Sequence, residues 1–173
     1  MNFEHVHRIA ELNGRYADAI DADRLEAWPD FFLDEGRYRI TTAENVAQDL
    51  PISIIYTTSR AMLRDRVRAL REANVYEGQR YRHVLGMPLI NGNVGIGGIA
   101  ARVGAGLKPA PTESIAARTS FIVARIMRSG ETLLFATGHY QDRVIFDGAN
   151  AIFAEKIVVL DSRQIDTLLA IPL

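Results

Sequence analysis

Hydrophobic side chains near the start of the chain recur at the spacing of an amphipathic helix. Between Val6 and Ile20 they follow the i, i+3, i+4, i+7 pattern, and charged residues occupy the rest of the helical wheel. A second helix is predicted from Ser59, which suits an N-cap, to about Ala73, with an apolar stripe that includes Met62. The pattern therefore predicts two long helices in the N-terminal half.

A short helix is predicted between these two. Asp23 is placed at its N-cap, and Glu26, three residues later, completes a capping-box-like pair. Pro29 directly follows Trp28 and is expected to kink or end this helix. Residues 43–50 are expected to add one or two helical turns.

Apolar and polar residues alternate with period two in most of the remaining chain, as in half-buried strands. Residues 36–42 alternate in this way, with Tyr38 and Ile40 on one face. Further strands are predicted at residues 81–90, 118–128, 131–146 and 151–160. Asp147 and Gly148 form a hairpin turn signal, and Gly138 marks a predicted bulge.

The order of these elements predicts the fold class. Helices followed by strands indicate an α+β fold, with the N-terminal helices packed on one side of a curved antiparallel sheet. Ser162 is expected to cap a short C-terminal helix that contains Ile165, Leu168 and Leu169. A length of 173 residues suits a single domain over residues 1–173.

Residues 91–112 interrupt the strand pattern with many glycines and two prolines. We interpret them as a loop insertion between two strands that is extended, mobile or in contact with a partner. The glycines do not match the G-x-G-x-x-G spacing of a dinucleotide-binding loop, so a flexible hairpin tip is favoured over a phosphate site.

Composition and charge exclude several classes of function for this chain. The chain is 48% hydrophobic and 24% charged, which is usual for a globular domain. Its 20 basic and 21 acidic residues give a net charge of -1, which argues against binding to nucleic acid. We see no targeting or membrane segment and expect a cytoplasmic protein. Because cysteine is absent, the chain has no disulfide, thiol catalyst or cysteine-bound cluster.

The positions of the four histidines give only weak evidence for a metal-binding site. His5 and His7 lie about 200° apart on a helix, so they cannot chelate one ion without unwinding. His83 and His139 lie on predicted strands and, with Asp142, could imitate a two-histidine, one-carboxylate iron site. The spacing does not support this site specifically, and structural, hydrogen-bonded histidines are favoured.

A proton-transfer site inside a curved sheet is the more serious enzymatic alternative, because an acid in an apolar pocket has a raised pKa. The candidate polar groups near apolar runs are Asp34, Tyr38, Tyr56, His83 and His139. The alternative interpretation, in which tyrosines line the core and charged groups face solvent, is favoured. Similarly, a basic stripe at Arg64, Arg68 and Arg71 either docks on an acidic partner or is simply solvated.

An ordered set of motifs resembles a known family. The run from Tyr56 to His83 is similar to the small (beta) subunit of aromatic-ring-hydroxylating, or Rieske non-haem iron, dioxygenases. In the first part of the chain, further matches are Trp28 with Phe31 and Phe32, followed by Tyr38, Glu44, Asn45, Leu50 and Pro51. In the last part, they are the G-x-Y-x-D strand at Gly138, Tyr140 and Asp142, followed by Asp161 and the final residues 168–173. The resemblance covers most of the chain, and the long glycine-rich stretch at 91–112 departs from it.

This resemblance implies a cone-shaped fold like that of nuclear transport factor, scytalone dehydratase and ketosteroid isomerase, with a curved mixed or antiparallel sheet. It implies an assembly of three large (alpha) and three small subunits, with the Rieske 2Fe–2S cluster and the mononuclear Fe(II) in the alpha subunit. A Rieske centre needs two cysteines, so this chain cannot hold it. The chain is therefore expected to have no cofactor and a structural role, and to form a homotrimer when alone.

Two other functions stay open from the residues. The chain could be a stand-alone isomerase or dehydratase that acts on a small aromatic or polyketide-like ligand, or a module that binds small ligands. A deep interior cavity lined by aspartate and histidine would favour the stand-alone enzyme, and a thermal-shift screen with aromatic acids would support the binding module. Within the resemblance, benzoate-, terephthalate- and salicylate-type oxygenases are not distinguished.

Overall fold

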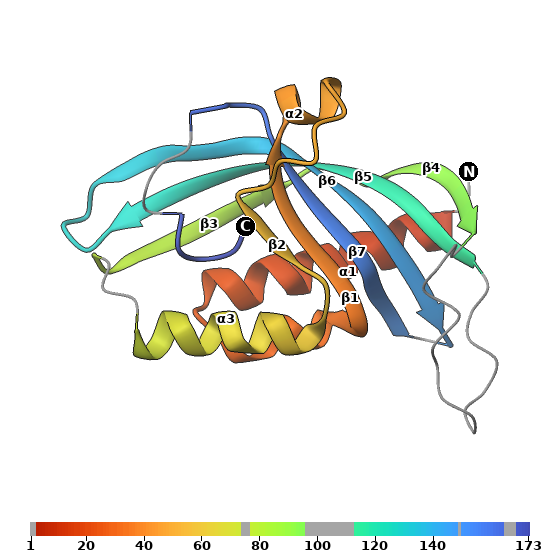
Figure 1. Ribbon diagram of the computed structural model, residues 1–173, viewed down its shortest axis with the longest axis horizontal. Coiled ribbons are helices and arrows are strands. Elements are labelled where there is room, and N and C mark those ends of the chain that lie inside the picture. Colours follow the sequence, from red (N-terminus) through yellow and green to blue (C-terminus); the bar gives the residue numbers. More distant parts are fainter. Residues whose placement is uncertain (1–2, 74–76, 96–112, 149, 165–168) are drawn as a thin grey trace.

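The computed structural model describes residues 3–73, 77–95, 113–148, 150–164 and 169–173, and these form one curved sheet with the two long helices on its inner side (Figure 1). The helices are α1 (Phe3–Asp21), η1 (Leu25–Phe31, a 3-10 helix), α2 (Ala43–Ala47) and α3 (Arg60–Glu72). The strands are β1 (Phe32–Thr42), β2 (Ile55–Thr57), β3 (Gln79–Leu85), β4 (Leu89–Gly95), β5 (Glu113–Met127), β6 (Thr132–Asp147) and β7 (Asn150–Leu160).

The sheet has seven strands in the described part of the chain, in the order β2-β1-β7-β6-β5-β3, and β4 pairs with β5 beside β3. All neighbours are antiparallel except β1 and β7, which run parallel. The sheet is therefore mixed, and the α+β class predicted from the sequence is confirmed.

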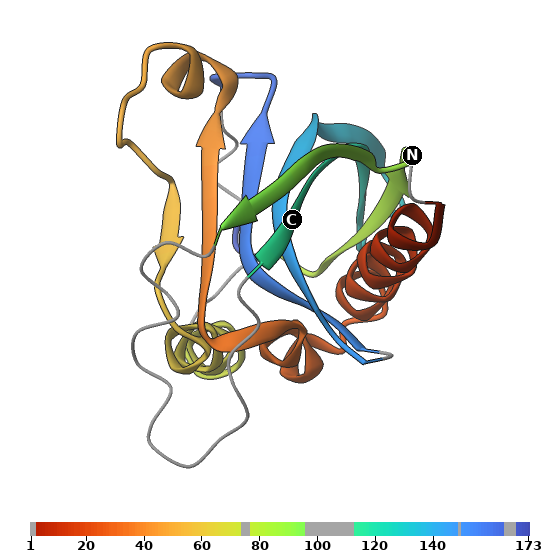
Figure 2. The same ribbon diagram turned by 90° about the vertical axis from the view of Figure 1, so that its right-hand side faces the viewer.

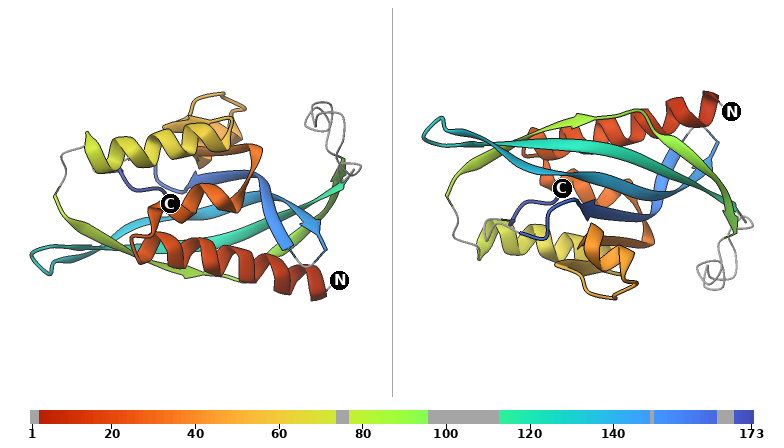
Figure 3. Two further views of the ribbon diagram at one scale, coloured as in Figure 1. Left: turned by 90° about the horizontal axis from the view of Figure 1, so that it is seen from below. Right: turned by 90° about the horizontal axis from the view of Figure 1, so that it is seen from above.

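The long strands curl, and α1 and α3 lie across the open side of the curve with η1 between them (Figures 2 and 3). α1 contacts β3 and β7, and α3 contacts β1 and η1. The C-terminus lies inside the space that the sheet and these helices enclose (Figures 1 and 3). The result is a cone with an inner face toward the helices and an outer face toward solvent.

Both long helices occur where their hydrophobic spacing predicts them. α1 buries Ile9, Tyr16 and Ile20 on one face. α3 begins after Ser59, whose hydroxyl accepts a hydrogen bond from the Met62 main-chain N–H, as predicted for an N-cap. Met62 itself is largely exposed, so it does not belong to the buried stripe.

The predicted capping box at Asp23 and Glu26 is wrong. The segment forms the 3-10 helix η1 without a side-chain cap, and Pro29 lies within it. Asp23 has a positive φ of 56° and, like Glu26, directs its carboxylate to the Arg71 guanidinium on α3. Both carboxylates therefore form long-range ion pairs with Arg71 and do not cap the helix as the local pattern predicted.

Two strand predictions also need correction. The strand predicted at residues 81–90 is two strands, β3 and β4, and residues 91–95 of the predicted insertion belong to β4. The bulge predicted at Gly138 lies instead at Phe135, because Val123 pairs with Ala136 and the next residue pairs with Leu134. Gly148 does form the predicted β6–β7 turn, with φ 56°.

Two predicted segments lie wholly or partly outside the described residues. They are residues 96–112 of the glycine-rich insertion and residues 165–168 of the C-terminal helix. At the start of the latter, the Ser162 hydroxyl accepts a hydrogen bond from the Gln164 main-chain N–H at 3.0 Å. None of the helices in the described part of the chain is long and apolar enough to cross a membrane.

Gly138 is needed for close approach of β6 to β7, not for a bulge. A Cβ atom at this position would lie 2.1 Å from the Val159 main-chain oxygen and 3.0 Å from the Phe121 ring. Because the first of these is a backbone atom in a paired strand, it cannot rotate away.

We therefore expect Gly138→Ala to lower the free energy of unfolding by about 3 kcal/mol or more, since overpacking of this kind forces backbone shifts. Gly14→Ala is the matched control, because a Cβ there meets nothing within 4 Å. In α1 this control is expected to be stabilising by up to about 1 kcal/mol. Urea unfolding measures both variants, and equal stabilities would contradict the prediction.

Candidate functional site

The interior of the cone is the place where a fold of this shape would hold a ligand, and aromatic side chains fill it. The Tyr16 ring packs edge-on against Phe153 at 5.7 Å, and Trp28 against Tyr38 at 5.1 Å. Phe121 stacks on Tyr140 at 4.6 Å. Other fully buried side chains around them are Ile9, Leu12, Leu25, Phe32, Ile40 and Tyr81. The interior is therefore a packed core.

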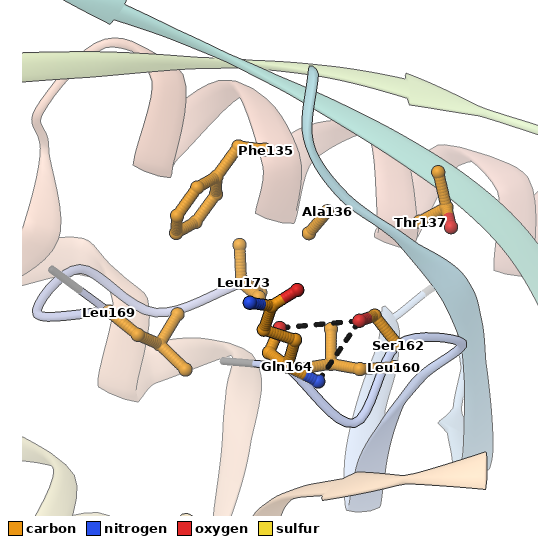
Figure 4. A pocket seen from close by; sticks show the side chains of 8 residues that line it. All are labelled: Phe135, Ala136, Thr137, Leu160, Ser162, Gln164, Leu169 and Leu173. Atoms are coloured by element: carbon orange, nitrogen blue, oxygen red, sulfur yellow. Dashed lines mark hydrogen bonds between the residues drawn. The ribbon is translucent and has the colours of Figure 1, made fainter. Parts of the chain in front are cut away.

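A small cavity remains at one end of this core (Figure 4). Its volume is about 30 Å³, and it is lined by Phe135, Ala136, Thr137, Leu160, Ser162, Gln164, Leu169 and Leu173. A drug-sized ligand needs roughly 300 Å³ or more, whereas this cavity has room for about one or two water molecules. None of the described residues that line it is an aspartate or a histidine.

Two of the five proposed pocket residues lie outside the interior. The Asp34 side chain is 89% exposed and forms an ion pair with Arg60 at 3.0 Å. Tyr56 lies on the edge strand β2 and is 55% exposed. Neither side chain is positioned to meet a ligand inside the cone.

Tyr38 and His83 do face the interior, but each is engaged. The Tyr38 hydroxyl donates to the Leu173 main-chain oxygen and accepts from its N–H, both at 3.1 Å. His83 Nδ1 lies 2.6 Å from an Asp21 carboxylate oxygen, and both side chains are nearly inaccessible to solvent. Among the described residues, no group hydrogen-bonds to His83 Nε2. A histidine–aspartate pair can move protons, but neither residue lines the cavity at the end of the core.

His139 lies on the outer face of the sheet. Its ring contacts Arg118 at 3.3 Å and Gln141 at 3.2 Å. Burial, and then the charge of Arg118, lowers the pKa of this imidazole. Because His83 points inward and His139 outward, the two do not form the iron site considered with Asp142. No group of three potential metal ligands occurs among the described residues.

The basic stripe on α3 is engaged in ion pairs with its own chain. Arg71 binds the carboxylates of Asp23 and Glu26 at 2.9 and 2.7 Å, which lowers the pKa of Glu26. Arg64 pairs with Asp30 at 3.2 Å. These contacts join α3 to η1, so the stripe stabilises the helical layer and is not a free basic surface.

A buried charge cluster that the sequence analysis did not identify lies inside the cone. Lys156 on β7 and Asp142 on β6 are both inaccessible to solvent, with Nζ 3.0 Å from a carboxylate oxygen. Asn13 on α1 completes the cluster: its oxygen accepts from Lys156 at 2.8 Å, and its amide donates to Asp142 at 3.1 Å. Lys156 Nζ also lies 3.7 Å from the centre of the Tyr140 ring.

Burial dominates the electrostatics of this cluster. It lowers the pKa of Lys156 to about 8, although the nearby Asp142 charge opposes this. It also raises the pKa of Asp142, against the opposing effect of Lys156. Both shifts show that desolvation outweighs attraction, so the pair adds little net stability, while loss of one partner is costly. Without contact to solvent or to a cavity, the pair cannot exchange protons with a substrate.

We expect Asp142→Asn to lower the free energy of unfolding by about 3–5 kcal/mol, because it leaves the Lys156 charge buried without a counter-charge. The double variant Asp142→Leu, Lys156→Met should lose much less than the sum of the single changes. Asp65→Asn breaks the exposed pair with Arg68 and is the control, with an expected change below about 0.5 kcal/mol. Additive effects in urea unfolding would show that the buried charges are not coupled.

Comparisons with known proteins agree with this geometry. The SnoaL-like domain family, whose members share the cone fold, matches residues 2–150. The chain is 41% identical to the beta 1 subunit of the terminal oxygenase component of terephthalate 1,2-dioxygenase from Comamonas sp, over 96% of this chain and 97% of that protein. It is 33% identical to the small subunit of anthranilate 1,2-dioxygenase from Burkholderia cepacia, over 95% and 92%.

A solved structure supports the same fold and the same family. The crystal structure of a beta subunit assigned to an aromatic-ring-hydroxylating dioxygenase of Novosphingobium aromaticivorans superposes with a TM-score of 0.76 at 32% identity, over 96% of this chain and 95% of that one. The expected cone-shaped fold is confirmed by these matches. The chain belongs to the family of small (beta) subunits of aromatic-ring-hydroxylating dioxygenases.

Proposed function

We propose that this chain, as a single domain over residues 1–173, is a structural, non-catalytic subunit. It assembles with a large (alpha) subunit that carries the Rieske cluster and the mononuclear iron. The observation that carries this proposal is the complete absence of cysteine in a member of this family. A Rieske cluster has two cysteine ligands, so the redox centre of the oxygenase has to be bound by another chain.

The filled interior supports this role over that of a stand-alone isomerase or dehydratase. Such an enzyme needs a cavity with a positioned acid or base. Here the cavity measures about 30 Å³, and the five candidate residues are spread between solvent, core and outer face. We propose that none of them is catalytic.

The outer face of the sheet supplies a surface suited to assembly. Val84 on β3 and Ile122 on β5 are register partners, and Leu134 lies on the neighbouring strand β6. Their exposures are 61%, 47% and 70%, which is unusual for apolar side chains grouped on one face. We call these three residues the outer patch and propose that it is covered in an assembly of three alpha and three beta chains, or in a beta homotrimer when alone.

The names of the relatives support a proposal about the substrate class. Both curated relatives belong to oxygenases named for aromatic carboxylates, terephthalate and anthranilate. We propose that the complete oxygenase acts on an aromatic carboxylate in aromatic degradation, with the choice of substrate made by the alpha subunit.

Purified alone, the chain is expected to leave benzoate, terephthalate and anthranilate unchanged in the presence of a reductase. Co-expression with an iron-containing alpha subunit should give a complex that turns over one of them. The triple variant Asp34→Ala, Tyr56→Phe, His139→Ala should keep turnover within about twofold, since these side chains are not placed at a reaction centre. Turnover by the chain alone, or loss of complex activity in this variant with assembly intact, would contradict the proposal.

The outer patch gives a second test. Val84→Asp together with Ile122→Asp should weaken assembly about 100-fold or more, because burying a charge in an apolar interface is costly. Ile52→Asp, at an exposed apolar residue outside the sheet, is the control. Sedimentation of the chain alone and of the complex measures the effect; unchanged assembly would place the interface elsewhere.

A further inference from the structure

The strand residues that point away from the helices include many arginines. Register partners on neighbouring strands point to the same side of a sheet, and so does every second residue along a strand. Counted from Ile122 of the outer patch, the outward positions of the described strands hold six arginines: Arg37, Arg39, Arg80, Arg82, Arg118 and Arg143. We call these six arginines the basic face. Of the described helices, only the short α2 lies on this side of the sheet (Figure 3).

Few acidic residues balance the basic face. The same counting gives Glu155 on β7 and Asp147 beside the β6–β7 turn. Arg128 and Asp161, directly beyond β5 and β7, add one charge of each sign. The outer side of the sheet is therefore basic, although the whole chain has a net charge of -1.

The basic face lies on both sides of the outer patch. On β3, Arg82 occupies the outward position next to Val84, and its register partner is Ala124. On β5, Arg118 lies two outward positions from Ile122, on the other side of the patch. An apolar centre with a polar rim is the usual arrangement of a protein–protein interface.

Several of these arginines have no counter-charge within the chain. Among the described residues, no acid forms an ion pair with Arg37, Arg80 or Arg118, and all three are exposed. Arg82 is 69% exposed and lies 3.9 Å from an Asp21 carboxylate oxygen, which is a weak contact. Because like charges on neighbouring strands repel one another, an acidic surface placed against this face would be attracted to it.

A second copy of this chain does not offer such an acidic surface on its helical layer, because most carboxylates there already bind arginines of their own chain. These ion pairs are Asp18 with Arg24, Asp23 and Glu26 with Arg71, Asp30 with Arg64, and Asp65 with Arg68. Two copies that met through their outer faces would place arginines against arginines. The partner that fits this face is therefore a different chain.

We propose that the outer face of the sheet binds the alpha subunit, and that the contacting alpha surface has apolar side chains opposite the outer patch and aspartate or glutamate opposite the basic face. This inference rests on the proposed function, and it selects the alpha subunit rather than a second beta chain as the occupant of the outer patch. The charges steer the two chains together and fix their orientation, while the patch supplies the apolar contact.

The first test is a competition between two beta chains for one alpha subunit. The wild-type chain and the triple variant Arg37→Glu, Arg80→Glu, Arg118→Glu are co-expressed with a tagged, iron-containing alpha subunit. Mass spectrometry of the purified complex then gives the ratio of the two beta chains. The variant should be captured at least about thirtyfold less than the wild type, because acidic side chains would then face acidic side chains.

The matched control makes the same change of charge on the helical layer. The triple variant Arg15→Glu, Arg24→Glu, Arg68→Glu should be captured within about twofold of the wild type, since exposed charges outside an interface contribute little. Equal capture of the two triple variants, with the wild type bound, overturns the inference but leaves the proposed function intact. No capture of the wild type overturns both.

Sedimentation of the free beta chains tests the choice of occupant. Reversal of charge on the outer face should leave the oligomeric state of the chain alone the same as that of the wild type. If the variant with Arg37, Arg80 and Arg118 replaced loses an oligomer that the control variant keeps, the outer face binds a second beta chain and the inference is wrong.

A test that keeps the charges uses the small number of lysines. The chain has two, Lys108 and Lys156, and the latter is completely buried. In the complex, Arg118→Lys introduces an exposed amine that a carbodiimide couples to a carboxylate in direct contact. Peptide mapping should find this amine joined to aspartate or glutamate of the alpha subunit, whereas Arg15→Lys should give no such product. Coupling of Arg118→Lys to another beta chain, or to no alpha carboxylate, overturns the inference.

Discussion

The mutual packing of aromatic rings inside the curved sheet is the constraint on which the rest of this structure depends. Tyr16 on α1 packs against Tyr140 on β6 and Phe153 on β7, and these rings meet only if the sheet curls around α1. Close packing of this kind excludes a ligand-sized cavity, because protein cores tolerate few voids larger than a water molecule. The same packing that stabilises the cone therefore removes the space that a cone enzyme would need.

A buried ion pair within this packing acts more through specificity than through stability. Lys156, Asp142 and Asn13 satisfy one another only in the observed register of β6 with β7 and with α1 across them. A slip of one residue would turn either strand over and leave a buried charge alone. Since desolvation outweighs attraction in the pair, its benefit is the exclusion of wrong registers rather than a gain in free energy.

Local sequence patterns predicted the helices and turns that depend on neighbouring residues, and they missed the contacts that depend on residues far away in the sequence. Helical periodicity located α1 and α3, and the Asp147-Gly148 turn located a hairpin. Asp23 was misassigned because its partner, Arg71, lies 48 residues away. Lys156 could have been noticed: counting back in steps of two from the apolar Val158 places this lysine on the buried face. The insertion of the tail into the cone has no signal in periodicity at all, because it depends on hydroxyls of Tyr16 and Tyr38.

Alternation along each strand gives the two faces of the sheet separate roles. On β5, Phe121 points into the core and stacks on Tyr140, while its neighbour Ile122 is exposed on the outer face. Substitutions on the outer face can therefore adapt the chain to its partners without disturbing the packing of the inner face. Because the interior is filled, the surface available for contact with partners lies on the outside of the sheet. The structural role that we propose therefore depends on how this outer face positions other chains.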